Sequence, residues 1–390
     1  MMLIQKPVLF IYSSFMAFFS TAIRSKSNLL LLPSVVGLTP NRAHRINAGN
    51  HWTRSSPFSS YTTLPATSDT IPYVKIKTNQ IPLSSGVTAE VKIATSKSGK
   101  NVYTKPPLVF IHGSFHSSWC WEKHYLPFFA HKGYGTTCAI SLRGTGGTYA
   151  GDGVTKIHID EHVDDITAFL KWLQGECSKD QPSPVLIAHS FGGLTVMKYL
   201  ERLHRNDSDS MDPSLPQLSG LCVACSVPPS GNGPMTLRYL RRSPVASYKL
   251  TVGFAMKKAI TNKSLCRDLF FGGTQDDNGI SDEEIEVIQR NFAQDTTAMI
   301  NLIELSKVLP SKLVDSTSGA VSFVEKLPPS MVIGASEDFV VDEQGVQETA
   351  QYFGVQPTWV DSPHDIMLGR RWQNGANAIL EWLEREVCSQ

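Results

Sequence analysis

The chain has 390 residues, of which 41% are hydrophobic and 18% are charged, as expected of an ordinary globular protein with one large or two modest domains. The first 68 residues hold six of the 36 bases and none of the 35 acids, so the remainder is mildly acidic and its charge argues against nucleic-acid binding. The seven cysteines follow no framework spacing, which suits a reducing compartment better than a disulfide-stabilised secreted fold.

The N-terminal segment, residues 1–65, has the composition of a targeting peptide. It lacks acids, is rich in Ser and Thr, and carries spaced Arg and Lys residues, which are features of chloroplast or mitochondrial transit peptides. A secretory signal or membrane anchor built on the apolar run 8–19 is the alternative, although that run is shorter than the ~20 residues that span a bilayer. We therefore expect a disordered transit peptide and a chloroplast location.

The next part of the chain alternates strand and helix patterns. Alternation of β-branched residues predicts strands at 73–77 and 87–93, joined by a turn. A short apolar run at 107–111 predicts a strand that is buried on both faces. A helical pattern at 119–132 and a further strand at 136–142 follow.

The alternation continues to the C-terminus. Further elements are expected in this order: helix 160–173, strand 185–188, a helix from 190 to about 205, strands 221–226, 330–334 and 358–360, and helix 376–387. Strands and helices at this spacing predict an α/β fold with a mostly parallel sheet covered on both faces.

One segment interrupts this rhythm. Residues 232–315 are mostly helical in pattern and carry little strand signal. We predict that they form a helical cap inserted into a core made of residues 70–231 and 316–390. A basic cluster in the cap, Arg238, Arg241 and Arg242, is interpreted as a solvated helix face, with a clamp for an anionic substrate as the alternative.

Ser190 is the strongest chemical signal in the chain. It lies in Ala188-His189-Ser190-Phe191-Gly192-Gly193, directly after a predicted buried strand and before a predicted helix. A serine at the tip of such a strand–turn–helix is typical of a nucleophile elbow, which holds the hydroxyl above a sheet where a base can reach it.

The base and the acid should follow the serine in the order Ser, Asp or Glu, His. Only two histidines come after Ser190, and His204 lies at the far end of the following helix. His364 lies just past the last predicted strand and is therefore the expected base.

The acid is expected on the loop after the strand 330–334. Asp338 is our choice there, with Glu337 and Asp342 as alternatives. No Asp or Glu occurs between Pro213 and Arg267, which excludes an acid placed one strand earlier.

Backbone N–H groups are needed to hold the negatively charged oxygen that forms during acyl transfer. Phe191, directly after the nucleophile, would supply one, and Ser114 the other, with Phe115 as the alternative to Ser114. His112 and His116 flank this loop, and we favour a structural role over a metal-binding pair because no carboxylate accompanies them.

These motifs together resemble the α/β-hydrolase superfamily over about residues 73–388. Within it, the segment HGSFHSSWCW at 112–121 is similar to the corresponding loop of the plant methylesterase and hydroxynitrile-lyase branch, and Ser141-Leu142-Arg143-Gly144 resembles the turn after the fourth strand. The resemblance implies an eight-stranded, mostly parallel sheet with a helical cap, and neither metal nor organic cofactor. Ala188 departs from the G-x-S-x-G pattern, but it is small enough for the turn.

The sequence thus favours a serine hydrolase that cleaves a small-molecule carboxylic ester or thioester through an acyl-enzyme. An acyltransferase or lyase using the same site, or a non-catalytic ligand-binding receptor or scaffold, are the alternatives. Membrane contact is expected only through a lipid substrate. An epoxide hydrolase or dehalogenase of this fold would carry Asp in place of Ser190.

Overall fold

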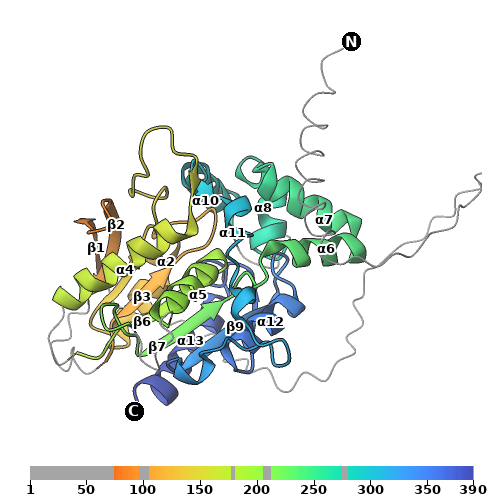
Figure 1. Ribbon diagram of the computed structural model, residues 1–390. Coiled ribbons are helices and arrows are strands. Elements are labelled where there is room, and N and C mark those ends of the chain that lie inside the picture. Colours follow the sequence, from red (N-terminus) through yellow and green to blue (C-terminus); the bar gives the residue numbers. More distant parts are fainter. Residues whose placement is uncertain (1–73, 96–104, 177–180, 205–211, 274–279, 390) are drawn as a thin grey trace, which may run out of the picture. The chain divides into compact units, whose positions relative to one another are not determined.

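The computed structural model describes residues 74–95, 105–176, 181–204, 212–273 and 280–389 (Figure 1). The predicted transit peptide, 1–65, lies outside these residues and stays a prediction. Among the described helices, none is long and apolar enough to cross a membrane.

The described chain is built on a sheet of eight strands in the order β1-β2-β4-β3-β6-β7-β9-β10 (Figure 1). β2 runs antiparallel to both of its neighbours, and all the other pairs are parallel. This confirms the α/β-hydrolase fold with a mostly parallel eight-stranded sheet. The strands are β1 (Lys75–Pro82), β2 (Thr88–Thr95), β3 (Leu108–Ile111), β4 (Thr137–Ile140), β6 (Val185–His189), β7 (Gly220–Ala224), β9 (Ser330–Glu337) and β10 (Thr358–Pro363).

The central strands read as continuous apolar runs because both faces of the sheet are covered. Every residue of β3, β4, β6 and β7 is buried, whereas most residues of the β1–β2 hairpin at the sheet edge are exposed or half-buried. Along β3, Val109 and Ile111 pack into one core, and Leu108 and Phe110 pack into the other. The two-residue period of a strand thus distributes one short sequence between two layers.

Helices form the two outer layers. One face of the sheet is covered by α4 (Ile159–Glu176), α5 (Phe191–Leu203) and α12 (Glu343–Phe353), and the other by α2 (Trp119–Glu122), α3 (Tyr125–His131) and α13 (Trp372–Trp382). The pattern predicted as one helix over 119–132 is two helices, since the chain leaves helical geometry at His124. α12 was not predicted from the sequence, although Asp342 caps its first turn and Gly354 ends it.

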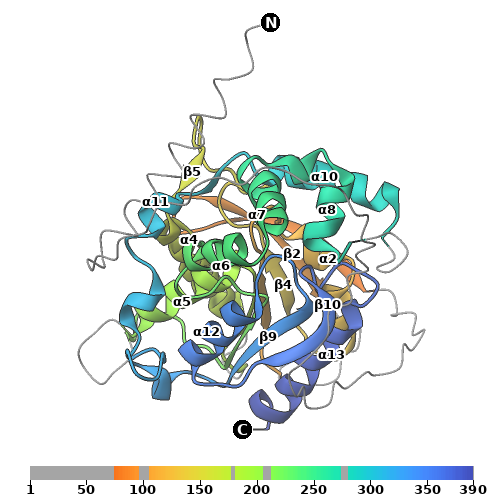
Figure 2. The same ribbon diagram turned by 90° about the vertical axis from the view of Figure 1, so that its right-hand side faces the viewer.

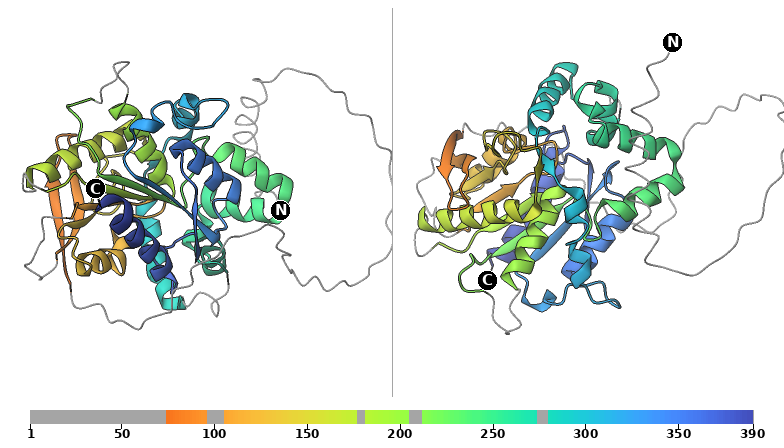
Figure 3. Two further views of the ribbon diagram at one scale, coloured as in Figure 1. Left: turned by 90° about the horizontal axis from the view of Figure 1, so that it is seen from below. Right: turned by 45° about the horizontal axis from the view of Figure 1, so that its top comes forward.

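The described residues of the range 232–313, which we call the β7–β9 segment, are mostly helical and gather beyond the carboxyl ends of the central strands (Figures 2 and 3). A two-stranded parallel pair that the sequence did not predict, β5 (Lys156–Ile157) with β8 (Met299–Ile300), ties this segment to the chain before α4. The assignment of 232–315 as a separate cap domain stays a prediction. The helices of the segment are α6 (Asn232–Arg242), α7 (Pro244–Leu250), a π-helical turn (Thr251–Ala255), α8 (Lys263–Phe270), α10 (Asp282–Asp295) and α11 (Leu302–Leu305).

Candidate active site

Ser190 lies on the sharp turn between β6 and α5 that the sequence predicted. Its φ of 52° and ψ of −119° are unfavourable for a residue with a side chain, and the backbone is held by hydrogen bonds from Ser190 N to Ala224 O (2.9 Å) and from Gly193 N to Ser190 O (3.1 Å). The turn is crowded: a methyl group added at Gly113 would lie 2.7 Å from the Ser190 Cβ, and one added at Gly192 would lie 2.6 Å from the His112 carbonyl oxygen. Glycine is therefore required at both positions by close approach.

The structure brings together the three side chains proposed from chain order. His364 Nε2 lies 3.1 Å from Ser190 Oγ, and His364 Nδ1 lies 2.8 Å from Asp338 Oδ2. Asp338 directly follows β9 and His364 directly follows β10, so the carboxyl ends of two adjacent parallel strands place them side by side. Both side chains are 2% exposed, so the chain of hydrogen bonds is shielded from water.

Backbone hydrogen bonds hold the Asp338 carboxylate in place beside His364. Its Oδ1 accepts hydrogen bonds from the backbone N–H groups of Val340 (2.7 Å) and Val341 (2.9 Å). The two alternative acids lie elsewhere: Glu337 pairs with Arg371, and Asp342 pairs with Arg238 and caps α12. Asp338 is thus the acid that contacts His364, and Arg238 is engaged with a carboxylate.

The environment of His364 favours its charged form. Burial alone would lower the pKa of His364, but the charge of Asp338 and the hydrogen bond to it outweigh burial, and Asp365 adds a weaker contribution in the same direction. The pKa is therefore raised above its ordinary value. An imidazole with this preference accepts a proton readily from a neighbouring hydroxyl.

His189, the residue before Ser190, supports the backbone of His364. Its Nε2–H donates to the His364 carbonyl at 2.9 Å, and burial, followed by the nearby charge of His364, lowers the pKa of His189 to about 3. It is therefore a neutral donor. The sequence did not single out this role.

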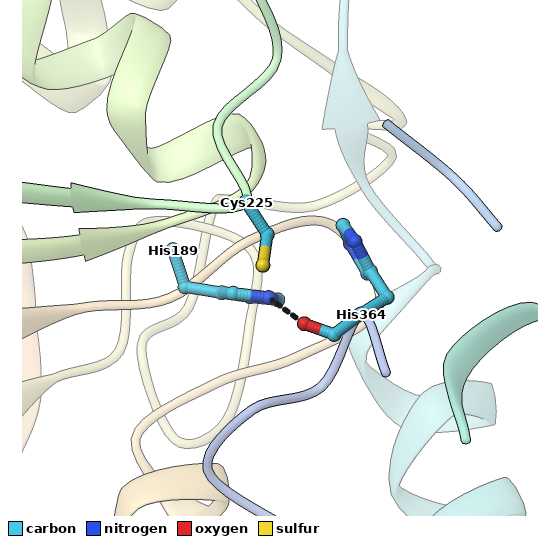
Figure 4. Close-up of side chains that lie close together, drawn as sticks. All are labelled: His189, Cys225 and His364. Atoms are coloured by element: carbon cyan, nitrogen blue, oxygen red, sulfur yellow. Dashed lines mark hydrogen bonds between the residues drawn. The ribbon is translucent and has the colours of Figure 1, made fainter. Parts of the chain in front are cut away.

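His189, Cys225 and His364 also form a compact group of metal-ligand types, with one donor atom of each lying within 4.8 Å of the others. Figure 4 shows the three side chains directed toward one another, with the His189 hydrogen bond to the His364 carbonyl dashed. His364 Nδ1 is bonded to Asp338, and burial raises the pKa of the Cys225 thiol well above its ordinary value, whereas a metal would require the thiolate. The hydrogen bonding fits a support for His364 and does not fit a metal site.

The loop after β3 carries the predicted backbone donors. The Gly113 carbonyl accepts from His112 Nδ1 at 2.8 Å, and His112 Nε2 accepts from the Leu142 N–H at 3.0 Å, so His112 is neutral with a fixed tautomer. Burial lowers the pKa of His112 to about 3, consistent with this assignment. Phe115 has a φ of 71°, in the left-handed region, which bends the loop sharply.

His116 bonds to the Ser114 carbonyl through Nδ1 (2.8 Å) and to Asp365 through Nε2 (3.0 Å). His112 and His116 are thus held by different partners and do not converge on a common metal position. A small cavity of about 40 Å³ lies against the loop, and both Ser114 and Phe191, the predicted backbone donors, line it.

Aromatic side chains of the β7–β9 segment cover the site. Phe254, Phe270 and Phe292 pack on Phe115 with ring centroids 5.2, 6.1 and 5.6 Å away, and the Phe270 ring lies 6.2 Å from that of His364. Ser190 is correspondingly only 7% exposed. These aromatic contacts join the β7–β9 segment to the loop beside Ser190.

Asp295, at the end of α10, links the β7–β9 segment to the rest of the chain near the site through hydrogen bonds. It accepts from the Trp119 indole N–H (2.8 Å) and from the Gly146 N–H (2.6 Å), while burial raises the pKa of its carboxyl.

His204, the histidine that was set aside as a base because it lies at the far end of the helix, stacks on Phe323 with ring centroids 4.5 Å apart.

Comparisons with known proteins agree with this architecture. A family model described as the alpha/beta hydrolase family matches residues 108–373. None of the curated protein sequences compared with the chain matches it.

Solved structures with a similar fold include an esterase from Exiguobacterium antarcticum (TM-score 0.54, 14% identity, 78% of this chain and 99% of that chain). A 2-hydroxy-6-oxo-6-phenylhexa-2,4-dienoate hydrolase from a Rhodococcus species has a TM-score of 0.54 at 14% identity, over 80% of this chain and all of that chain. A putative aryl esterase from Burkholderia cenocepacia has a TM-score of 0.51 at 14% identity, over 79% of this chain and all of that chain. At these identities the likeness establishes the fold, while the methylesterase-like branch stays a prediction.

Proposed function

The chain belongs to the alpha/beta hydrolase family, and on that premise we propose that it is a serine hydrolase that cleaves a carboxylic ester or thioester through an acyl-enzyme. The observation that carries the proposal is the buried, hydrogen-bonded series Ser190–His364–Asp338, with donor–acceptor distances of 3.1 and 2.8 Å. The chain order Ser, Asp, His and the position of each residue directly after a strand support this proposal.

In the proposed mechanism, His364 Nε2 takes the hydroxyl proton of Ser190 while Oγ attacks the acyl carbon. The carbonyl π electrons move to the oxygen, and the N–H groups of Ser114 and Phe191 stabilise the resulting negative charge. His364 then gives its proton to the leaving oxygen or sulfur as the bond to the acyl carbon breaks. Asp338 holds the ring in the required tautomer and stabilises the imidazolium.

Deacylation repeats these steps with water. His364 Nε2 takes a proton from the water molecule, whose oxygen attacks the acyl-enzyme, and the proton returns to Ser190 Oγ as the carboxylic acid leaves. The site requires no electron transfer and no additional group, because each proton taken by His364 is given back within the cycle.

The names of similar structures favour ester substrates. Those with TM-scores of at least 0.5 include proteins described as an esterase, an aryl esterase and a lipase, alongside a 2-hydroxy-6-oxo-6-phenylhexa-2,4-dienoate hydrolase and an epoxide hydrolase. A serine at position 190 supports the acyl-enzyme route. The cavity beside Ser114 and Phe191 is lined in part by Phe115, Leu142 and Ala298, which suits a substrate with an apolar acyl group.

The proposal is tested with the full-length chain and a panel of short p-nitrophenyl esters and thioesters. We expect turnover that is abolished in Ser190→Ala and in His364→Ala. A folded wild type without turnover on any member of the panel would favour the non-catalytic receptor alternative. Acyl transfer to an added alcohol or amine in place of water would instead favour an acyltransferase.

The chloroplast location belongs to this proposal as well. It is supported by the acid-free, hydroxyl-rich composition of the first 65 residues. A fluorescent protein fused behind these residues is expected to enter plastids. Its appearance in mitochondria or in the secretory pathway would replace the proposed address with one of the alternatives.

A further inference from the structure

His116 has a hydrogen-bond acceptor at each of its ring nitrogens. Nδ1 lies 2.8 Å from the Ser114 carbonyl oxygen and Nε2 lies 3.0 Å from Asp365 Oδ2, and the His116 and Asp365 side chains are 1% and 0% exposed. A neutral imidazole carries a single N–H, so His116 can donate to both the Ser114 carbonyl and an ionised Asp365 only as an imidazolium. With Asp365 ionised, the two side chains form a buried ion pair inside the candidate active site.

The surroundings of Asp365 support its ionised form. Burial alone would raise the pKa of this carboxyl, but the charge and hydrogen bond of His116, with smaller contributions from His189 and His364, outweigh burial and lower the pKa. A buried charge is retained in a folded protein when it is paired in this way. The pair is thus a fixed connection between the loop after β3 and the residue that follows His364.

The hydrogen bond to Ser114 determines the orientation of a peptide unit. In a trans peptide the C=O and the N–H point in opposite directions, so a carbonyl held by His116 Nδ1 directs the Phe115 N–H to the other side of the loop. The preceding peptide is held in the same manner, because the Gly113 carbonyl accepts from His112 and the Ser114 N–H shares its plane. Two successive N–H groups that point away from carbonyls held in this way can form an anion-binding concavity.

Asp365 anchors this arrangement to the rest of the site. It directly follows His364 in the chain, and its own N–H donates to the Phe270 carbonyl of α8 at 3.0 Å. The position of His116 is therefore coupled through Asp365 to both the catalytic-histidine loop and the β7–β9 segment.

We propose that His116 and Asp365 are a pair of positioning residues that hold the backbone donors of the 113–115 loop toward the charge that develops on the substrate oxygen. This inference rests on the proposed acyl-transfer function. In it, Asp365 holds the imidazolium, and the bond from His116 Nδ1 to the Ser114 carbonyl is the one that affects the reaction rate. This bond fixes the peptide that carries the Phe115 N–H, the alternative donor, and through the shared Ser114 Cα it restrains the adjoining peptide that carries the Ser114 N–H.

Two isosteric substitutions test the two hydrogen bonds of His116 one at a time, because each variant keeps only one of them. Asn places its amide nitrogen near the position of Nδ1, whereas Gln places its amide nitrogen near that of Nε2. His116→Asn thus keeps a donor for the Ser114 carbonyl, and His116→Gln keeps a donor for Asp365.

Full loss of an oxyanion donor lowers kcat by about 10²–10³-fold, and a misdirected donor should have a smaller effect. We expect His116→Gln to lower kcat by about tenfold to a hundredfold and His116→Asn by less than about threefold. KM should change little in either variant, because neither bond involves the substrate.

A second pair of variants addresses the same question from Asp365. Asn can donate to Nε2 of a neutral His116, which leaves Nδ1–H on the Ser114 carbonyl, whereas Leu has a similar size and no hydrogen bond. Asp365→Asn should keep kcat within about threefold, and Asp365→Leu should lose about tenfold or more.

The measured quantity is kcat divided by the number of sites that a fluorophosphonate labels at completion. Only folded sites are labelled, so this ratio separates an effect on positioning from an effect on stability. Equal kcat per labelled site in His116→Gln and His116→Asn, or an unchanged value in Asp365→Leu, would overturn the inference. A wild type that neither labels nor turns over would instead refute the proposed function itself. If the His116 variants yield no labelled sites, the Asp365 pair decides.

Discussion

Two buried histidine–aspartate pairs lie in one site and differ in their third partner. His364 joins Asp338 to the Ser190 hydroxyl, whereas His116 joins Asp365 to the Ser114 carbonyl oxygen. A hydroxyl can give up its proton, so His364 alternates between neutral and charged forms during the proposed reaction. A carbonyl oxygen only accepts, so the bond from His116 Nδ1 to Ser114 transfers no proton in the proposed reaction and holds the ring in a fixed position.

The difference shows that the chemistry of a histidine–carboxylate pair depends on what lies beyond the ring. His189 lies between the two pairs, with ring centroids 6.0 Å from His116 and 4.8 Å from His364. Because it is neutral and donates to the His364 backbone, it connects the pairs without adding charge. Substitutions can therefore test whether one pair takes part in proton transfer while the other only holds the backbone.

The largest effects are expected in the pair that reaches Ser190. His364→Ala removes the base, and Asp338→Asn leaves the histidine in the wrong tautomer, so each should lower kcat by about 10⁴-fold. Steady-state kinetics on a p-nitrophenyl ester tests this. If Asp338→Asn kept more than a tenth of the wild-type activity, the two histidine–aspartate pairs would not differ in the proposed way. Asp338 would then act no differently from a structural carboxylate.

The next largest effect is expected in the loop that His116 holds. In Gly113→Ala the new methyl group would lie 2.7 Å from the Ser190 Cβ, so the loop or the elbow has to shift. We expect kcat to fall by about 10²-fold, comparable to the loss of an oxyanion donor.

Gly175→Ala, in α4, is the matched control, because a Cβ there meets no neighbour within 4 Å and alanine suits a helix better than glycine. It should leave kcat unchanged. Equal kcat in the two alanine variants would show that the packing of the loop against Ser190 is unimportant for the reaction.

The pH dependence of kcat/KM also tests the effect of Asp338 on His364. His364 has to be neutral to accept the Ser190 proton, so kcat/KM should fall as pH drops through its pKa, which is raised above 6.5 by Asp338 despite burial. The acid limb of the wild type should therefore lie above pH 6.5. In Asp338→Asn the residual activity should show this limb at lower pH, because the charge that raises the pKa is gone. A limb that does not move would contradict the assignment of Asp338.

The smallest effect is expected next to Asp338 in the sequence. Glu337 pairs with Arg371 at the surface, an interaction worth about 0–1 kcal/mol, and does not contact His364. Glu337→Gln should therefore keep kcat within about twofold and leave the melting temperature nearly unchanged. A loss approaching that of Asp338→Asn would mean that the neighbouring carboxylates share the role.

The sequence predicted that Asp338 and His364 meet Ser190 because all three residues lie on predictable turns. Ser190, Asp338 and His364 each follow a strand, and the parallel sheet aligns those strand ends. The second pair could not be predicted in this way. His116 and Asp365 are separated by 249 residues, and nothing in the local pattern indicates that a loop histidine meets the residue after the base.

Other differences have similar physical causes. The β5–β8 pair has two residues in each strand, too few for an alternation to be recognised. α12, in contrast, carried readable signals in Asp342 and Gly354 at its two ends. The close approach of Gly113 to Ser190 depends on tertiary packing, which sequence spacing does not reveal.

Covalent labelling of the full-length chain with a fluorophosphonate, followed by peptide mapping, tests whether Ser190 is an activated nucleophile. We expect a single adduct on Ser190 that is absent in Ser190→Ala and forms far more slowly in His364→Ala. No adduct on the folded wild type, or equal labelling of Ser190→Ala, would contradict it.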